Sequence, residues 1–324
     1  MIIASGPFQE LDEMRIQCNI CPHNCVLKNG ETGLCKEKIN IENSLYTLNF
    51  REITIAEPRP IEQTPFFEFY QETTALNLGG YSCNFWCPFC LNYEISYNTS
   101  SDLRSKTFSN NDILKLVKET NSKGVVFTFN EPAIMHETVI DIFSFIKRVD
   151  SSIYTAIHSN GFMSKKVIDL IIKYTDGFVF DIKGDDSFYL QMSATFDSIW
   201  NNIRKINNKK RHLELVIPLF TEFMNDNTIT KIMNKLINDN INCPIIILKG
   251  RPITKYNNFT QVSQKKAEDI VKLFKENGFH ESYLMGFPGS KYESSYCKKC
   301  GKITLYRYDA VPMFREDIDY CKCK

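Results

Sequence analysis

The feature that most constrains this chain is a short loop with three cysteines, Cys83, Cys87 and Cys90. The loop follows an apolar run at 74–78 and reads GGYSCNFWCPFC. Its cysteines have the spacing C-x3-C-x2-C. Three thiolates on one loop can bind three irons of a cubane cluster, which leaves the fourth iron without a ligand from this loop. An open metal position is typical of a catalytic site rather than a structural one.

Most of the other cysteines form two groups near the ends of the chain. The first group has the spacing C-x2-C-x3-C-x9-C and consists of Cys18, Cys21, Cys25 and Cys35. The second joins a C-x2-C-G knuckle to a terminal C-x-C pair and consists of Cys297, Cys300, Cys321 and Cys323. Four thiolates suit either zinc or an iron–sulfur cluster, and both remain open for the first group. The second group is typical of a structural zinc ribbon, and the alternative is a second cluster or a knuckle that docks a partner.

Two further residues are given structural roles. His23 lies inside the first cysteine group, and we predict a polar loop residue because four cysteines already complete a metal site. Cys243 precedes an apolar run and is predicted to be a small buried hydrophobe.

Bulk composition excludes some classes of function. The net charge of +1 gives no sign of a nucleic-acid-binding surface. The first residues lack the basic region and long apolar run of a secretory signal, and no stretch has the length of a membrane span. We therefore expect a soluble cytoplasmic protein without a membrane partner.

From residue 74 onward, short apolar runs alternate with amphipathic helical stretches, as in parallel βα units. The predicted strands are 74–78, 125–129, 153–157, 178–182, 213–217, 245–248 and 282–285. The predicted helices are 111–120, 133–148, 164–174, 226–238 and 263–277. About six repeats fit a partial (β/α)6 TIM-type barrel better than a full barrel. The run at 57–60 contains two prolines and is predicted to break any regular element.

These patterns predict an α/β protein in three parts. The parts are a cysteine-rich extension at 1–73, a partial barrel at 74–286 and a cysteine-rich, zinc-ribbon-like tail at 287–324. Functional groups of such barrels lie at the carboxyl ends of the strands. The candidate residues there, together with one in the cysteine loop, are Phe89, Asn130, Glu131, Ser159, Asn160, Asp181 and Lys183.

Several of these residues also have a plain structural interpretation. Glu131 precedes a proline and would cap the helix that follows. Asn160 is followed by glycine and would form a turn by itself. Asp181 and Lys183 lie two residues apart on one strand face and would form a salt bridge. His158 is predicted to be a rim histidine with satisfied hydrogen bonds.

The segment 83–96, CNFWCPFCLNYEIS, resembles the radical S-adenosylmethionine (SAM) component of the AmmeMemoRadiSam system. That family is related to the activating enzymes of glycyl-radical enzymes. The N-terminal C-x2-C-P-x2-C element, TFNEP at 128–132, SNG at 159–161, DIK at 181–183 and GFPG at 286–289 are also similar. The resemblance therefore covers most of the chain.

The resemblance implies a partial TIM barrel with a 4Fe-4S cluster on the cysteine loop and SAM on its open iron. The reduced cluster would cleave SAM to a 5′-deoxyadenosyl radical. The electron would come from a reductant such as a flavodoxin or ferredoxin. Asn130 and Glu131 are then expected to meet the SAM amine, and Ser159 and Asn160 its carboxylate or ribose. Asp181 and Lys183 are expected to bind the ribose or carboxylate of SAM, a cation or the substrate. The backbone of Phe89 is expected to contact the adenine.

The chain departs from the activating enzymes at three places. His158-Ser159 stand where those enzymes have an Asp-Thr pair beside a monovalent cation. The resemblance therefore does not extend to a cation site in this chain. Pro218 is followed by leucine rather than glycine, and the last cysteine pair is C-x-C.

Three functions follow from these patterns. The first is a radical SAM enzyme that abstracts hydrogen from an unidentified substrate, such as a protein or peptide. The second is a glycyl-radical-enzyme activase. The third is a non-catalytic binding scaffold whose cysteines hold only zinc.

Overall fold

The computed structural model describes residues 2–12, 14–99, 105–251 and 259–323. Its centre is an eight-stranded sheet with the order β16-β15-β14-β13-β12-β11-β9-β8. The strands are β8 Ile55–Pro60, β9 Thr74–Gly79, β11 Gly124–Phe127, β12 Tyr154–Ser159, β13 Gly177–Asp181, β14 His212–Leu219, β15 Ile245–Lys249 and β16 Ser282–Met285. All pairs from β9 to β16 are parallel. The seven predicted strands and the partial α/β barrel are confirmed.

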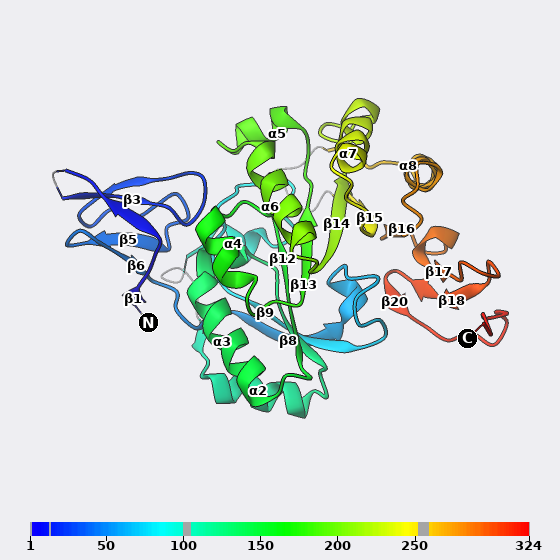
Figure 1. The fold of residues 1–324 in the computed structure, drawn as a ribbon, viewed down its shortest axis with the longest axis horizontal. Helices are drawn as coiled ribbons and strands as arrows, with labels where there is room; N and C mark the ends of the chain where they lie inside the picture. Colours follow the sequence, from blue (N-terminus) through cyan, green and yellow to red (C-terminus); the bar gives the residue numbers. More distant parts are fainter. Residues whose placement is uncertain (1, 13, 100–104, 252–258, 324) are drawn as a thin grey trace.

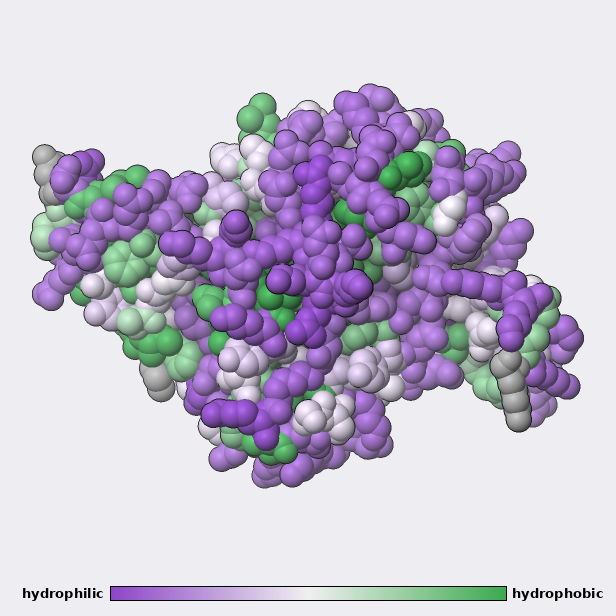
Figure 2. Space-filling model, viewed as in Figure 1, coloured by the Kyte–Doolittle hydropathy of each residue, from purple (hydrophilic) through white to green (hydrophobic). Residues whose placement is uncertain are grey.

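Helices cover the outer face of this sheet (Figure 1). The covering helices are α2 Asn110–Glu119, α3 His136–Val149, α4 Lys165–Ile171, α5 Asp186–Gln191, α6 Phe196–Asn208, α7 Asp226–Asn238 and α8 Gln264–Glu276, and the short helix α1 Tyr93–Ser96 follows the cysteine loop. Short 3-10 helices are η1 Ile61–Gln63, η2 Pro132–Met135 and η3 Lys291–Glu293. The solvent-facing sides of the covering helices are mostly hydrophilic (Figure 2).

The prediction that the run at 57–60 breaks any regular element is wrong, because these residues belong to strand β8. It pairs antiparallel with β9 from Ile55 opposite Gly79 to Pro60 opposite Thr74. Proline cannot donate a ladder hydrogen bond, so it is confined to edge strands or bulges. β8 is an edge strand of the sheet, which explains why it tolerates Pro58 and Pro60.

The core has two parts, on opposite faces of the same strands. Residues such as Val125 and Phe127 pack under the covering helices, whereas Val126 between them packs on the inner face. This alternation is the side-chain period of a strand. The inner face is filled by a segment before β9, which contributes Phe66, Phe67 and other aromatic side chains.

The two ends of the chain form small antiparallel sheets on opposite sides of the barrel (Figure 1). The N-terminal strands are β1 Ile3–Ala4, β2 Phe8–Glu10, β3 Arg15–Cys18, β4 Val26–Lys28, β5 Lys38–Ile41 and β6 Ser44–Thr47. The C-terminal strands are β17 Ser295–Tyr296, β18 Ile303–Leu305, β19 Arg307–Tyr308 and β20 Val311–Pro312. Strand β7 Glu52–Ile53 pairs with β10 Lys106–Thr107. Among the described residues, no helix is long and apolar enough to cross a bilayer.

A buried ion pair fastens the N-terminal sheets to the barrel. Lys38 Nζ lies 2.7 Å from both carboxylate oxygens of Glu137 at the start of α3, and Lys38 is fully buried. Burial opposes ionisation of Glu137, but His136 and Lys38 outweigh it and lower the pKa of this carboxyl group. Because the folded pKa is the lower one, the unfolded chain binds more protons as pH falls through this range. The stabilisation is therefore complete above the ordinary glutamate pKa and declines below it.

The Glu137→Gln variant should be less stable than the wild type by about 1.5–3 kcal/mol at pH 7, because charged hydrogen bonds are lost. The difference should shrink as pH falls below about 4.3, the ordinary glutamate pKa. Urea unfolding at several pH values measures it. Glu119→Gln is a matched control, because its partner Lys115 is exposed and such pairs contribute little. A difference that stayed constant down to pH 3 would contradict the linkage.

Candidate cofactor site

The cysteine loop and the carboxyl ends of the strands enclose one cavity of about 160 Å³. All seven residues predicted for the cofactor line it, together with the three loop cysteines. The lining residues from the strand ends include Asn130, Glu131, Ser159, Asn160, Asp181 and Lys183, and Phe89 comes from the loop. The parallel strands thus bring to one rim residues that are about a hundred positions apart in the sequence.

The loop is held to the barrel by side-chain amides. Asn130 Oδ1 accepts a hydrogen bond from the Gly80 N–H at 2.9 Å, and Asn130 Nδ2 donates to the Tyr81 carbonyl at 2.8 Å. Asn84 Nδ2 donates to the Phe162 carbonyl at 2.8 Å. Asn130 is therefore a residue that positions the loop, and its amide is already engaged within the protein.

The three loop thiols suit an iron–sulfur cluster. Cys83, Cys87 and Cys90 all face the cavity, and burial raises the pKa of each thiol, that of Cys87 to about 12. A bound metal displaces these protons and compensates the charge of the thiolates. Their sulfur atoms are not all within 4.8 Å of one another. A cubane, with one iron for each thiolate, accommodates a wider separation than a single zinc ion does.

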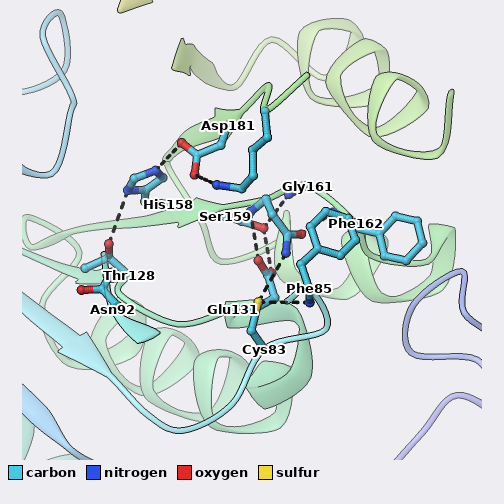
Figure 3. A network of polar contacts seen from close by, with 12 residues as sticks. Cys83, Phe85, Asn92, Thr128, Glu131, His158, Ser159, Gly161, Phe162 and Asp181 are labelled. Atoms are coloured by element: carbon cyan, nitrogen blue, oxygen red, sulfur yellow. Dashed lines mark hydrogen bonds and ion pairs between the residues drawn. The ribbon is translucent and has the colours of Figure 1, made fainter. Parts of the chain in front are cut away.

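Glu131, which follows β11 and lines the cavity, contacts the end of β12 (Figure 3). Its Oε1 accepts hydrogen bonds from Ala133 N at 2.8 Å and from Ser159 Oγ at 2.7 Å. Its Oε2 accepts one from Asn160 N at 2.9 Å. The capping role considered from the sequence is therefore present, at the N-terminus of η2. Contact with a SAM amine stays a prediction.

Asn160 connects the end of β12 to the cysteine loop. Its Nδ2 donates to Asn84 Oδ1 at 2.8 Å and lies 3.7 Å from Cys83 Sγ. Its Oδ1 accepts from the Phe162 N–H at 2.8 Å, as expected for the turn formed with Gly161. A hydrogen-bond donor near a cluster thiolate tunes its electron density, so Asn160 lies where it could act on a cluster bound by Cys83.

Asp181 is the centre of a charged network at the opposite side of the cavity (Figure 3). Its two oxygens lie 2.8 Å from His158 Nε2 and 2.6 Å from Lys183 Nζ. Burial alone would raise the pKa of Asp181, but His158 and Lys183 outweigh it and hold the pKa well below its usual range. The carboxylate is therefore ionised and paired. His158 Nδ1 also lies 3.4 Å from Thr128 Oγ1, so the hydrogen bonds of this histidine are satisfied.

Aromatic side chains form another wall of the cavity. Phe89 stacks on Phe220 with ring centroids 4.4 Å apart, and on Phe188 at 5.6 Å. Phe220 follows directly after β14, so the wall joins the cysteine loop to the fifth parallel strand. A flat apolar wall of this kind suits a nucleobase or an apolar substrate group.

The cavity contains functional groups that were not among the predicted site residues. Thr128, Lys249 and Arg251 line it, and Lys249 and Arg251 extend from the end of β15. Lys249 and Arg251 come directly after a predicted strand in the sequence. The expectation that functional groups lie at the carboxyl ends of the strands could therefore have identified them. Ser82 and Asn84 also hold the loop, which only contacts between distant segments reveal.

The tail cysteines form a compact group. The sulfur atoms of Cys297, Cys300, Cys321 and Cys323 all lie within 4.8 Å of one another. Four Zn–S bonds of about 2.3 Å place the sulfurs roughly 3.8 Å apart, so this spacing suits one tetrahedral zinc ion. The group can bind a metal; zinc remains the metal that we predict there.

The model of the Radical SAM superfamily matches residues 78–236, which include the cysteine loop and most of the strand ends described above. The chain contains a radical SAM domain. It is 25% identical over 324 residues to an uncharacterized protein of Methanocaldococcus jannaschii, covering 98% of this chain and 95% of that protein. It is also 24% identical over 145 residues to a 7-carboxy-7-deazaguanine synthase of Clostridium acetobutylicum, covering 44% of this chain and 63% of the synthase.

Two solved structures resemble part of this chain. A domain of a pyruvate-formate lyase-activating enzyme from Bacteroides vulgatus is 20% identical, with a TM-score of 0.42, and covers 50% of this chain and 99% of its own. SuiB from Streptococcus suis bound to S-adenosylmethionine is 14% identical, with a TM-score of 0.49, and covers 65% of this chain and 50% of its own.

Proposed function

We propose that this chain is an enzyme that cleaves SAM reductively and uses the resulting 5′-deoxyadenosyl radical to abstract hydrogen from a substrate. The observation that carries the proposal is the cavity in which three loop thiols face the polar ends of parallel strands. A 4Fe-4S cluster on Cys83, Cys87 and Cys90 would supply the electron and an open iron for SAM. A flavodoxin or ferredoxin is the proposed reductant, and a protein or peptide is the proposed substrate class.

The residues of the chain would bind and orient the cofactor. Ser159 and Asn160 at the end of β12 would meet the carboxylate or ribose of SAM, and Glu131 beneath them would hold both in place. Phe89 and Phe220 would exclude water beside the adenine. Lys183 already supplies a positive charge to Asp181, so we propose no monovalent cation at this carboxylate.

A narrower family assignment is part of the same proposal. The segment 83–96 and the similar motifs at 128–132, 159–161 and 181–183 favour the AmmeMemoRadiSam branch.

All 12 cysteines are free thiols, which favours the reducing cytoplasm as the compartment.

The proposal is tested with protein purified without oxygen. We expect bound iron and sulfide, and formation of 5′-deoxyadenosine and methionine when SAM and dithionite are added. Protein that contains zinc alone and forms no 5′-deoxyadenosine would instead be the non-catalytic scaffold. A glycyl radical on an added partner protein, detected by electron paramagnetic resonance (EPR), would assign the substrate to the glycyl-radical class.

A further inference from the structure

The N-terminal cysteine group lies directly against the loop that is proposed to hold the SAM-binding cluster. Ser82 Oγ donates a hydrogen bond of 2.5 Å to the Cys35 carbonyl, and Ser82 is bonded covalently to Cys83. A second contact joins His23 Nε2 to the Asn84 carbonyl at 2.8 Å. One hydrogen bond and one peptide unit therefore separate a cysteine of the first group from a cysteine of the loop.

The backbone at this junction is held in an unusual conformation. Ser82 has a φ of 62°, in the left-handed region that residues other than glycine seldom adopt, and it is 3% exposed. Such a conformation persists only where the surroundings determine it. The hydrogen bond to Cys35 is one of the contacts that fix it, so the two cysteine segments form one buried unit.

The spacing of the N-terminal sulfur atoms separates this group from the tail group. Cys18, Cys21, Cys25 and Cys35 line one small enclosed cavity. Among the described residues, only the tail group has at least three ligand atoms all within 4.8 Å of one another. The four N-terminal sulfurs are thus further apart than one zinc ion requires, and in this respect they resemble the loop cysteines. A cubane carries an iron at each of four corners and suits this wider arrangement.

The surroundings of the group also suit a cluster of negative charge. The backbone N–H groups of Ile20, His23 and Glu37 lie near the sulfurs of Cys18, Cys21 and Cys35, respectively, and favour their thiolate forms. The buried Lys38 lines the same cavity. Hydrogen bonds to the sulfurs, burial and nearby charge are the features that set the potential of such a cluster.

We propose that Cys18, Cys21, Cys25 and Cys35 hold a second 4Fe-4S cluster that passes single electrons to the SAM-binding cluster. All four irons would have a protein ligand, so this cluster would have no open position and would carry electrons only. A reduced ferredoxin or flavodoxin would give it one electron and become oxidised. The N-terminal cluster would pass that electron across the Cys35–Ser82–Cys83 contact and return to its oxidised state. The relay role rests on the function proposed above.

Metal content tests the cluster without any SAM chemistry. A variant with alanine at Cys83, Cys87 and Cys90, purified without oxygen, should keep about four irons and four sulfides, against about eight of each in the wild type. Its reduced form should show the EPR signal of a 4Fe-4S cluster. A variant without iron but with one more zinc than the tail requires would overturn the proposal. This result stands whether or not the protein cleaves SAM.

Electron delivery tests the relay. The Cys21→Ala/Cys25→Ala variant should form 5′-deoxyadenosine at the wild-type rate with dithionite, but at least tenfold more slowly with reduced ferredoxin. Cys300→Ala is a control that should lose tail metal and keep the ferredoxin-driven rate. An unchanged ferredoxin-driven rate in the double variant would overturn the relay. Wild-type protein gives an independent measurement if the double variant does not fold, because two reduced clusters this close should broaden each other's EPR signals. Two unbroadened signals would contradict the adjacency.

Discussion

Replacing Cys87 with alanine should abolish 5′-deoxyadenosine formation, whereas replacing Cys243 with alanine should leave the rate near that of the wild type. Both thiols are 6% exposed and both belong to the packed core, so the two changes remove similar buried volume. They differ in their neighbours. Cys87 faces the cavity between Cys83 and Cys90, whereas Cys243 lies before β15, away from the three cysteine groups. The pair therefore separates loss of a cluster ligand from loss of packing.

Product quantification and iron analysis on the same samples distinguish the outcomes. Cys87→Ala should lose the iron of the loop cluster, because two remaining thiolates hold a cubane poorly. A Cys87→Ala protein that still formed 5′-deoxyadenosine would exclude Cys87 as a cluster ligand. Equal losses in both variants would mean that the core, rather than the cluster, had been damaged.

Replacing Arg307 with methionine should lower the free energy of unfolding by about 3–5 kcal/mol, because it removes a buried charge and leaves its hydrogen-bond partners unpaired. Arg307 is 1% exposed although it lies in the tail. Its Nη2 donates to the Phe67 carbonyl at 2.8 Å, and its Nη1 donates to Ser295 Oγ at 2.9 Å. The carboxylates of Glu62, Glu68 and Glu214 lie close enough to interact with its charge. Methionine keeps much of the volume but leaves these groups without their cation.

Urea unfolding of Arg307→Met beside Arg315→Met measures this effect. Arg315 also belongs to the tail and pairs with Asp317, but both side chains are about half exposed or more. Exposed pairs contribute about 0–1 kcal/mol, so the control should unfold almost as the wild type does. A small loss at Arg307 would show that the tail does not stabilise the inner face of the barrel.

The barrel could be predicted from the sequence because its strands are short apolar runs with clear boundaries. Helix α6 was not predicted, although Ile199, Ile203 and Ile206 recur on one face and Thr195 caps its N-terminus. Strand β8 was missed for a different reason: two prolines argue against a strand unless it lies at an edge, and the edge is a property of the whole sheet. The domain boundaries at residues 73 and 286 remain predictions. Strand β8 lies before the first boundary and pairs with β9, which lies after it.

The site could be predicted only as a set of residue types at strand ends. All seven candidates line one cavity, as parallel topology requires. Their partners could not be predicted, because they depend on packing between distant segments. Asn160 reaches Asn84 in the cysteine loop, and Arg307 reaches Phe67 across 240 positions. The contact of Ser82 with Cys35, which underlies the proposed electron path, is of the same kind.

The prolines of β8 have a consequence for how copies of this protein behave in concentrated solution. An edge strand with free N–H groups can pair with a strand of another molecule and start aggregation. Pro58 and Pro60 have no N–H to offer at this edge. At the other edge, η3 packs against β16. The barrel can therefore remain open for its cofactor and substrate without presenting an edge that readily recruits a second sheet.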